Sequence, residues 1–148
     1  MSRRLLSCQR GAAVVEFAVA VPVFAFMLIG LIETTRYTFF GITAAHAARA
    51  AVQYGAQNVV TAADTTGMKN AATADVGNPS AWTVTPTHLC TSSGSVITCP
   101  NGSGAMVSSL TYFVQVQVTG TFTPLIRYPG LPSSVPVTAS ATMRVIGQ

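Results

Sequence analysis

The pattern of apolar and polar positions changes twice along the chain. Residues 12–32 form an apolar run that carries a single charged residue, Glu16. Residues 44–55 then repeat small side chains at three- and four-residue spacing, as on one face of a helix. Beyond residue 77, apolar and polar side chains alternate in the segments 114–119 and 135–145. A period of two is typical of half-buried strands, so the chain is expected to pass from helix to sheet.

The apolar run is long enough to cross a membrane. As a helix, residues 12–32 measure about 32 Å, against a hydrocarbon core of about 30 Å. Pro22 would cost about 3 kcal/mol inside a helix in water but is tolerated in membrane helices. A buried helix of a soluble domain and a secretory signal peptide are the alternatives, and the run is longer than the about 7–15 apolar residues of a signal peptide. A membrane span is therefore favoured.

The charges that flank the run predict its orientation. Arg3, Arg4 and Arg10 precede it, whereas Arg36 and Arg49 follow it. Because basic residues are concentrated on the cytoplasmic side of membrane spans, the N-terminus is expected in the cytoplasm and the rest of the chain outside that membrane.

The helix is expected to continue past the run to about Gly55. Its small side chains form one stripe, made of Ala44, Ala47, Ala48, Ala51 and Gly55. Small residues let backbones approach closely, so the stripe packs either on helices of neighbouring subunits or on a sheet of this chain. Further along, Asp64 is a candidate N-cap for a short helix that ends near Asp75. The turn at residues 77–79 is expected to begin the β region.

The alternating segments predict the head of the molecule. Residues 114–119 and 135–145 are expected to pair as antiparallel strands, joined by the Pro- and Gly-rich connection 123–134, with residues 82–84 as a candidate third strand. The apolar side of this sheet can cover the small face of the helix. The predicted fold is α+β: a long N-terminal helix, membrane-spanning in its first half, packed on a small antiparallel β-sheet head.

Composition narrows the function further. Charged residues make up 8% of the 148 residues, against about 25% in typical domains, and the net charge of +4 comes largely from the N-terminus. Residues 76–126 contain no Asp, Glu, Lys or Arg and are rich in Ser and Thr, as in a surface-exposed module. No nucleic-acid partner is expected. With four acidic residues and two His, no catalytic set or cofactor is indicated, and residues 101–104 are interpreted as a turn and loop rather than a nucleophile elbow.

The junction before the apolar run has a distinctive sequence. Arg10-Gly11-Ala12-Ala13-Val14-Val15-Glu16-Phe17 places Gly directly before the run and a lone Glu five residues later. This resembles the recognition site of prepilin peptidases, which cut after the Gly on the cytoplasmic side. The run itself, the Ala/Arg-rich residues 42–51 and the C-terminal residues 137–144 resemble the TadE/TadF-like minor pilins (pseudopilins) of tight-adherence (Tad/Flp) pilus systems. Thr34-Thr35 departs from that pattern, where an apolar residue and Gly are expected.

The resemblance implies three parts and a role for Glu16. Residues 1–11 would be a prepilin leader, residues 12–57 the transmembrane and assembly helix, and residues 58–148 the exported α+β head. Cleavage between Gly11 and Ala12 would create an amine that pairs with Glu16 of a neighbouring subunit. The alternative is that Glu16 only favours the start of the helix through its dipole, by about 0.3–1 kcal/mol.

The cysteines fit this division of the chain. Cys8 lies in the leader, which leaves Cys90 and Cys99 in the exported part. An even number of cysteines outside the cytoplasm favours a disulfide, and closing so short a loop contributes about 2–3 kcal/mol. A metal site with His88 as third ligand is less favoured, because eight residues between the two cysteines exceed the usual spacing.

The sequence therefore predicts a non-catalytic, pilin-like subunit of the bacterial inner membrane. The resemblance implies a prepilin peptidase, the pilus assembly platform and other pilins as partners in a hetero-oligomer, and a role in adhesion or secretion-related assembly, with incorporation into an extracellular pilus as one outcome. The rival interpretation is an uncleaved single-pass anchor that displays a Ser/Thr-rich binding module. The N-terminus of the mature chain distinguishes the two.

Overall fold

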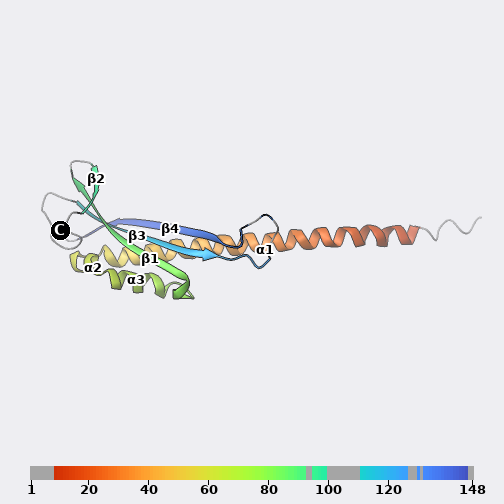
Figure 1. The fold of residues 1–148 in the computed structure, drawn as a ribbon, viewed down its shortest axis with the longest axis horizontal. Helices are drawn as coiled ribbons and strands as arrows, with labels where there is room; N and C mark the ends of the chain where they lie inside the picture. The colour runs from red at the N-terminus through yellow and green to blue at the C-terminus, as the bar shows by residue number, and fades with distance from the viewer. Residues whose placement is uncertain (1–8, 93–94, 100–110, 127–129, 131, 147–148) are drawn as a thin grey trace, which may run out of the picture. The chain divides into compact units, whose positions relative to one another are not determined.

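One long helix leads into a small α+β head. The computed structural model describes residues 9–92, 95–99, 111–126, 130 and 132–146. Its elements follow the order α1 (Gln9–Gly55), α2 (Val59–Ala63), α3 (Thr65–Ala74), a 3-10 turn (Pro79–Ala81), β1 (Trp82–Ser92), β2 (Ser95–Thr98), β3 (Thr111–Phe122) and β4 (Val135–Arg144) (Figure 1). The chain divides into two compact units, residues 1–37 and 38–148, and the division falls within α1.

The described residues of the first unit, 9–37, are helical, and the stretch from Ala13 to Ile32 is apolar on every side apart from Glu16. Pro22 lies inside α1 without ending it. The side chains of Val15, Phe17 and Met27, on different faces, remain 65%, 71% and 67% exposed. The most apolar stretch of this helix is long enough to cross a membrane, and none of it is buried inside the protein. A helix that is apolar all round needs surroundings other than water, which makes this segment a membrane-span candidate.

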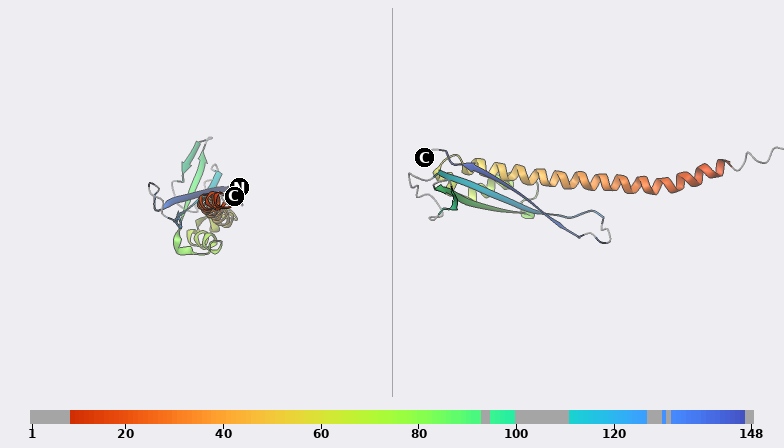
Figure 2. Two further views of the ribbon diagram at one scale, coloured as in Figure 1. Left: turned by 90° about the vertical axis from the view of Figure 1, so that its right-hand side faces the viewer. Right: turned by 90° about the horizontal axis from the view of Figure 1, so that it is seen from above.

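The second unit is built on a four-stranded antiparallel sheet with the strand order β2-β1-β3-β4 (Figure 2). The predicted pairing of the two alternating segments is confirmed, since β3 and β4 are antiparallel neighbours with Val118 opposite Ala139. Residues 82–84 are the start of β1, a strand much longer than that segment, and β1 pairs with the other edge of β3. The short edge strand β2 was not predicted.

Helices cover one face of this sheet. Ala44, Ala47, Ala48 and Ala51 of α1 are fully buried, as are the β3 residues Val114, Val116 and Val118. All of these except Ala44 share one core with Met68 and Ala72 of α3. The small-residue stripe of α1 therefore packs on the sheet of its own chain, which settles the two alternatives left open by the sequence. Gly55 shows how close the elements lie, because a Cβ there would stand 2.5 Å from Sδ of Met68.

The opposite face of the sheet is polar. Its side chains alternate with the buried ones and come from β1, β3 and β4, in rows such as Thr83, Thr119 and Thr138 or Thr85, Gln117 and Ser140. This face carries hydroxyl and amide groups, with Arg144 at one end. The head is thus a two-layer α+β structure, as the sequence predicts.

Local caps define the helices after α1. Asn58 and Thr61 form a capping box at the start of α2. The predicted cap of α3 is confirmed: the Asp64 carboxylate accepts a hydrogen bond from the backbone N–H of Gly67 at 2.8 Å. Two predicted features, the loop at residues 101–104 and the leader through Cys8, lie outside the described residues.

The packing of α1 on β3 makes a direct prediction. Ala48→Leu should lower the free energy of unfolding of the head by about 1–3 kcal/mol, because the added atoms overpack a filled core. Gln53→Leu, on the exposed side of the same helix, should change it by less than about 0.5 kcal/mol. Thermal unfolding followed by Trp82 fluorescence measures both. Equal effects of the two substitutions would contradict the tight Ala–Val contact.

Candidate assembly site

The predicted cleavage point lies within the first turns of α1. The helix begins at Gln9, so the Gly11–Ala12 peptide bond is already helical. Gly in a helix interior costs about 0.5–1 kcal/mol relative to Ala. Nothing lies within 4 Å of the position that a Cβ of Gly11 would take, so packing within this chain does not require Gly there.

Glu16 is an exposed carboxylate among exposed apolar side chains. Its neighbours Val15 and Phe17 are 65% and 71% exposed. Because α1 begins at Gln9, Glu16 lies beyond the first turn of the uncut helix. The helix dipole acts within the first turn, so it does not account for Glu16 in the full-length chain. Only a chain that starts at Ala12 would bring Glu16 close to a helix N-terminus.

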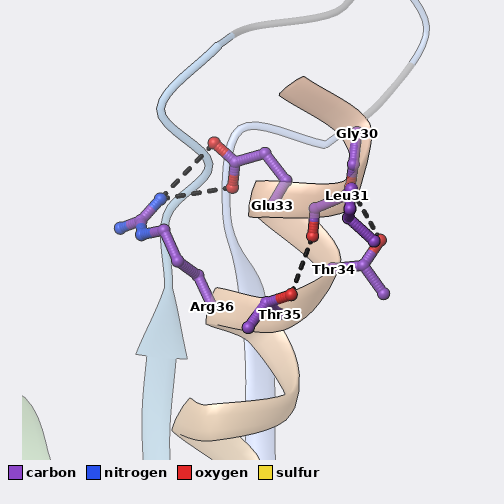
Figure 3. Close-up of polar contacts among 6 residues, drawn as sticks. All are labelled: Gly30, Leu31, Glu33, Thr34, Thr35 and Arg36. Atoms are coloured by element: carbon purple, nitrogen blue, oxygen red, sulfur yellow. Dashed lines mark hydrogen bonds and ion pairs between the residues drawn. The ribbon is translucent and has the colours of Figure 1, made fainter. Parts of the chain in front are cut away.

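Just after the apolar run, a set of polar side chains forms hydrogen bonds within α1 (Figure 3). Arg36 donates to both carboxylate oxygens of Glu33, at 3.2 and 3.4 Å. The hydroxyl of Thr34 donates to the carbonyl of Gly30 at 2.8 Å, and that of Thr35 to Leu31 at 2.9 Å. Such back-bonding removes the cost of a hydroxyl in apolar surroundings, which explains how the helix accommodates Thr34-Thr35.

An aromatic cluster joins α1 to the strand ends. The ring of Phe40 stacks on Trp82 with 4.3 Å between centroids and meets Phe122 edge-on at 5.9 Å. Gly120 makes room for this cluster, because a Cβ there would lie 2.6 Å from the indole of Trp82. The cluster thereby fixes the start of β1 and the end of β3 against α1 at Phe40.

Cys90 and Cys99 form the predicted disulfide. Cys90 of β1 is fully buried and is linked to Cys99, just after β2, with 5.2 Å between their Cα atoms. Nε2 of His88 lies within hydrogen-bonding distance of the Ala62 carbonyl. All three residues weighed for a metal site are thus engaged in other contacts. Among the residues that the structure describes, no group of three His, Cys, Asp or Glu side chains could hold a metal ion.

A polar pair links α1 to α3. The hydroxyl of Tyr54 donates to the Asp64 carboxylate at 2.9 Å. The hydrogen bond from the Gly67 N–H, followed by that from Tyr54, holds the pKa of Asp64 below its ordinary value of 3.8. The same Asp64 carboxylate, together with desolvation, raises the pKa of Tyr54 above 10.0. Each group is thus kept in the protonation state that the hydrogen bond needs.

These features define a helix-led α+β protein, in which one helix supplies an apolar N-terminal segment and then part of the core of the head. Residues 11–53 match a family model described as TadE-like protein. The N-terminal region of the chain is therefore similar to the TadE-like protein family, and the resemblance found in the sequence is confirmed there. Comparisons with curated proteins and with solved structures give no match.

Sequence reasoning missed two of these contacts. Nothing in the spacing of Phe40, Trp82 and Phe122 indicates that they meet, although a single Trp at the start of an expected strand was a signal of a packing anchor. The Tyr54–Asp64 bond was also missed, because Asp64 was expected only as a helix cap and Tyr54 had no expected role. The structure places Gly11, Ala12 and Glu16 on one helix, which begins at Gln9 rather than at the predicted residue 12.

The Tyr54–Asp64 pair predicts how stability depends on pH. A depressed pKa means that the stabilisation from Asp64 is present above about pH 4 and is lost as the pH falls through the folded-state pKa. The raised pKa of Tyr54 means that its contribution is complete below its ordinary pKa and is lost as the pH rises through the folded value. Between pH 7 and pH 3 the melting temperature should therefore fall less in Asp64→Asn than in the parent. Asp75→Asn, which changes an exposed carboxylate, should behave as the parent, and an unchanged acid response of Asp64→Asn would refute the assignment.

Proposed function

We propose that this protein is a pilin-like subunit of a Tad-type pilus system, made as a membrane-anchored precursor and cut by a prepilin peptidase between Gly11 and Ala12. The single observation that carries the proposal is the TadE-like match over residues 11–53, whose first residue is Gly11. Residues 1–11 act as the leader, residues 12–57 as the transmembrane and assembly helix, and residues 58–148 as the exported head. Its partners are the peptidase, the assembly platform and other pilins.

The helix has the properties that this role requires. Its apolar segment is exposed on all sides, so it can sit in the inner membrane before assembly and against other helices afterwards. Gly11 occupies a position where the chain itself has no need of Gly, which fits recognition by a peptidase that accepts only a small residue. The basic leader favours a cytoplasmic N-terminus, so the head with its disulfide lies on the oxidising side of the membrane.

The protein acts by assembly rather than by catalysis. The conspicuous contacts of the head are structural: an Ala–Val core, an aromatic cluster, a capped helix and a disulfide. Hydroxyl and amide side chains on the outer face of the sheet suit a surface that meets water or other subunits after export.

Cleavage gives Glu16 its partner. The new α-amino group of Ala12 has an ordinary pKa of about 7.7–8.0 and is mostly protonated at neutral pH. In apolar surroundings an isolated charge is costly, whereas a paired one is stabilised. The amine of an incoming subunit therefore pairs with Glu16 of its neighbour and sets the stagger between the two helices.

The first experiment determines the N-terminus of the mature protein. With the peptidase present, the parent chain should begin at Ala12, and Gly11→Arg should remain at precursor length because the bulky side chain blocks the cut. Gly11→Ala, which adds only a Cβ into open space, is the matched control and should be processed. A parent chain that keeps Met1 or Ser2 would instead support an uncleaved anchored module.

The second experiment tests Glu16 separately. Glu16→Ala should leave membrane insertion and cleavage intact but reduce incorporation into the pilus at least tenfold, since the amine of the incoming subunit loses its partner. Glu16→Asp keeps the charge and should retain most incorporation. The readout is the ratio of subunit in sheared pili to subunit in membranes. Equal ratios for Glu16→Ala and the parent would show that Glu16 has no part in assembly.

A further inference from the structure

Strand β4 forms an open edge of the sheet. It is the last strand in the order β2-β1-β3-β4, so within the described part of the chain only one of its two sides is paired. The backbone N–H of Val145 donates to the Tyr112 carbonyl at 3.0 Å, just beyond the paired residues Phe113 and Arg144. Hydrogen-bonded and non-hydrogen-bonded pairs alternate along an antiparallel ladder. The odd-numbered residues of β4 therefore bond to β3, and the even-numbered residues direct their N–H and C=O groups away from the sheet.

A side-chain contact supports this assignment. Thr119 and Thr138 lie opposite each other with 3.2 Å between their hydroxyl oxygens, and side chains approach more closely in non-hydrogen-bonded pairs. Successive outward groups are about 7 Å apart along the strand. The row of donors begins at Thr138, because Pro136, the preceding outward residue, has no N–H. The outward N–H groups are those of Thr138, Ser140, Thr142 and Arg144.

The opposite edge of the sheet is protected. The short strand β2 covers residues 89–92 of β1, and the disulfide between Cys90 and Cys99 holds it there. Further along the same edge, Pro86 has no N–H to offer, and α3 contacts β1. Strand β4 has no such protection among the described residues and carries no charge before Arg144. Long, uncharged edges of this kind are templates for the addition of another strand.

The side chains of β4 specify which strand fits beside it. Val137, Ala139 and Ala141 lie on the same side of the sheet as the buried valines of β3, but they are only half-buried. An added strand with apolar side chains on this side would remove more of their surface from water. On the other side of the sheet, the hydroxyl side chains of β4 are exposed and suit polar cross-strand partners.

One charge restricts the source of that strand. Arg144 is exposed at the end of β4 and is the only charged residue of this strand. An acidic side chain opposite it would form a favourable cross-strand pair. The chain contains no Asp or Glu after Asp75, so no strand of a second copy can supply that side chain. The complementary strand therefore belongs to a different protein.

We propose that the free edge of β4 accepts an extended strand of a different protein subunit, which alternates apolar and polar side chains and carries an acidic residue opposite Arg144. The inference rests on the proposed function, since the assembly supplies this subunit. Backbone hydrogen bonds contribute the affinity and the alternating side chains the specificity, as in other complexes formed by strand addition.

Amide hydrogen exchange at single-residue resolution tests the edge without any substitution. The mature protein is pulse-labelled in sheared pili and as the purified subunit, then quenched and fragmented. In the purified subunit, the amides of Thr138, Ser140 and Thr142 should exchange freely, whereas those of Ala139 and Ala141 should be slow because they bond to β3. In pili, exchange at the three outward amides should slow about a hundredfold.

The outcomes separate this inference from the proposed function. A subunit that enters pili but keeps fast exchange at the outward amides would overturn strand addition and leave the pilin role intact. A chain that enters no pilus would overturn the pilin role and strand addition together. Alternating protection that appears in the purified subunit as its concentration rises would show pairing between copies of this chain and overturn the assignment to a different protein.

Two matched pairs of variants test the backbone and the charge. Ser140→Pro removes one outward N–H and should lower incorporation into pili about tenfold, whereas Ser140→Ala keeps the N–H and should match the parent. Arg144→Glu places like charges opposite each other and should also lower incorporation, whereas Lys69→Glu, at an exposed site on α3, should not. All four variants should be cleaved as the parent. Parental incorporation of Ser140→Pro or of Arg144→Glu would contradict the proposal.

Discussion

The head depends on the close approach of α1 to β3. Three alanines of the helix and three valines of the strand are fully buried in one core, and Gly55 stands where a Cβ would strike Met68. Close-packed protein interiors tolerate little change in side-chain volume. Strand β3, which shares this core with α1, is an interior strand of the sheet, and α3 lies against its other interior strand, β1.

The two halves of α1 are suited to different environments, and their side chains differ accordingly. Up to Ile32 it is apolar on every side apart from Glu16. Such a helix is suited to apolar surroundings on all sides, either lipid or other apolar helices. From Ala44 onward it buries one narrow face of small residues and exposes His46, Arg49 and Gln53 on the other. Between these segments, four polar side chains form hydrogen bonds within the helix: those of Glu33, Thr34, Thr35 and Arg36. The change from apolar to polar residues therefore leaves the backbone hydrogen bonds of α1 intact.

The features that could be predicted from sequence are those with a strong period or a local cap: α1 to Gly55, α3 with Asp64, and the pair β3–β4.

The remaining elements of the head lack such a signal in the sequence. Strand β1 alternates, but its buried side includes Pro86, His88 and Cys90 rather than aliphatic residues, and Pro normally argues against a strand interior. Pro86 is tolerated because the described part of β2 pairs only with residues 89–92, which leaves the β1 edge free at that point. Helix α2 and strand β2 are too short to show any period, and the meeting of Phe40 with Trp82 depends on the tertiary fold. For the assembly site, Gly11, Ala12 and Glu16 were chosen from the resemblance to prepilin peptidase substrates, and their roles in cleavage and assembly stay predictions.

Strand β3 runs antiparallel to the part of α1 beside it, since Phe40 contacts Phe122 and Gly55 lies against Val114, and this arrangement has a mechanical consequence. A pull applied to the head through α1 acts along the helix and parallel to the strand, so it loads their interface in shear. The stacked ring of Phe40 and the interlocked Ala and Val side chains would then have to slide together rather than separate one after another. Forced unfolding depends on the rate of crossing that barrier, so this geometry resists tension far better than one in which the helix could be peeled from the sheet.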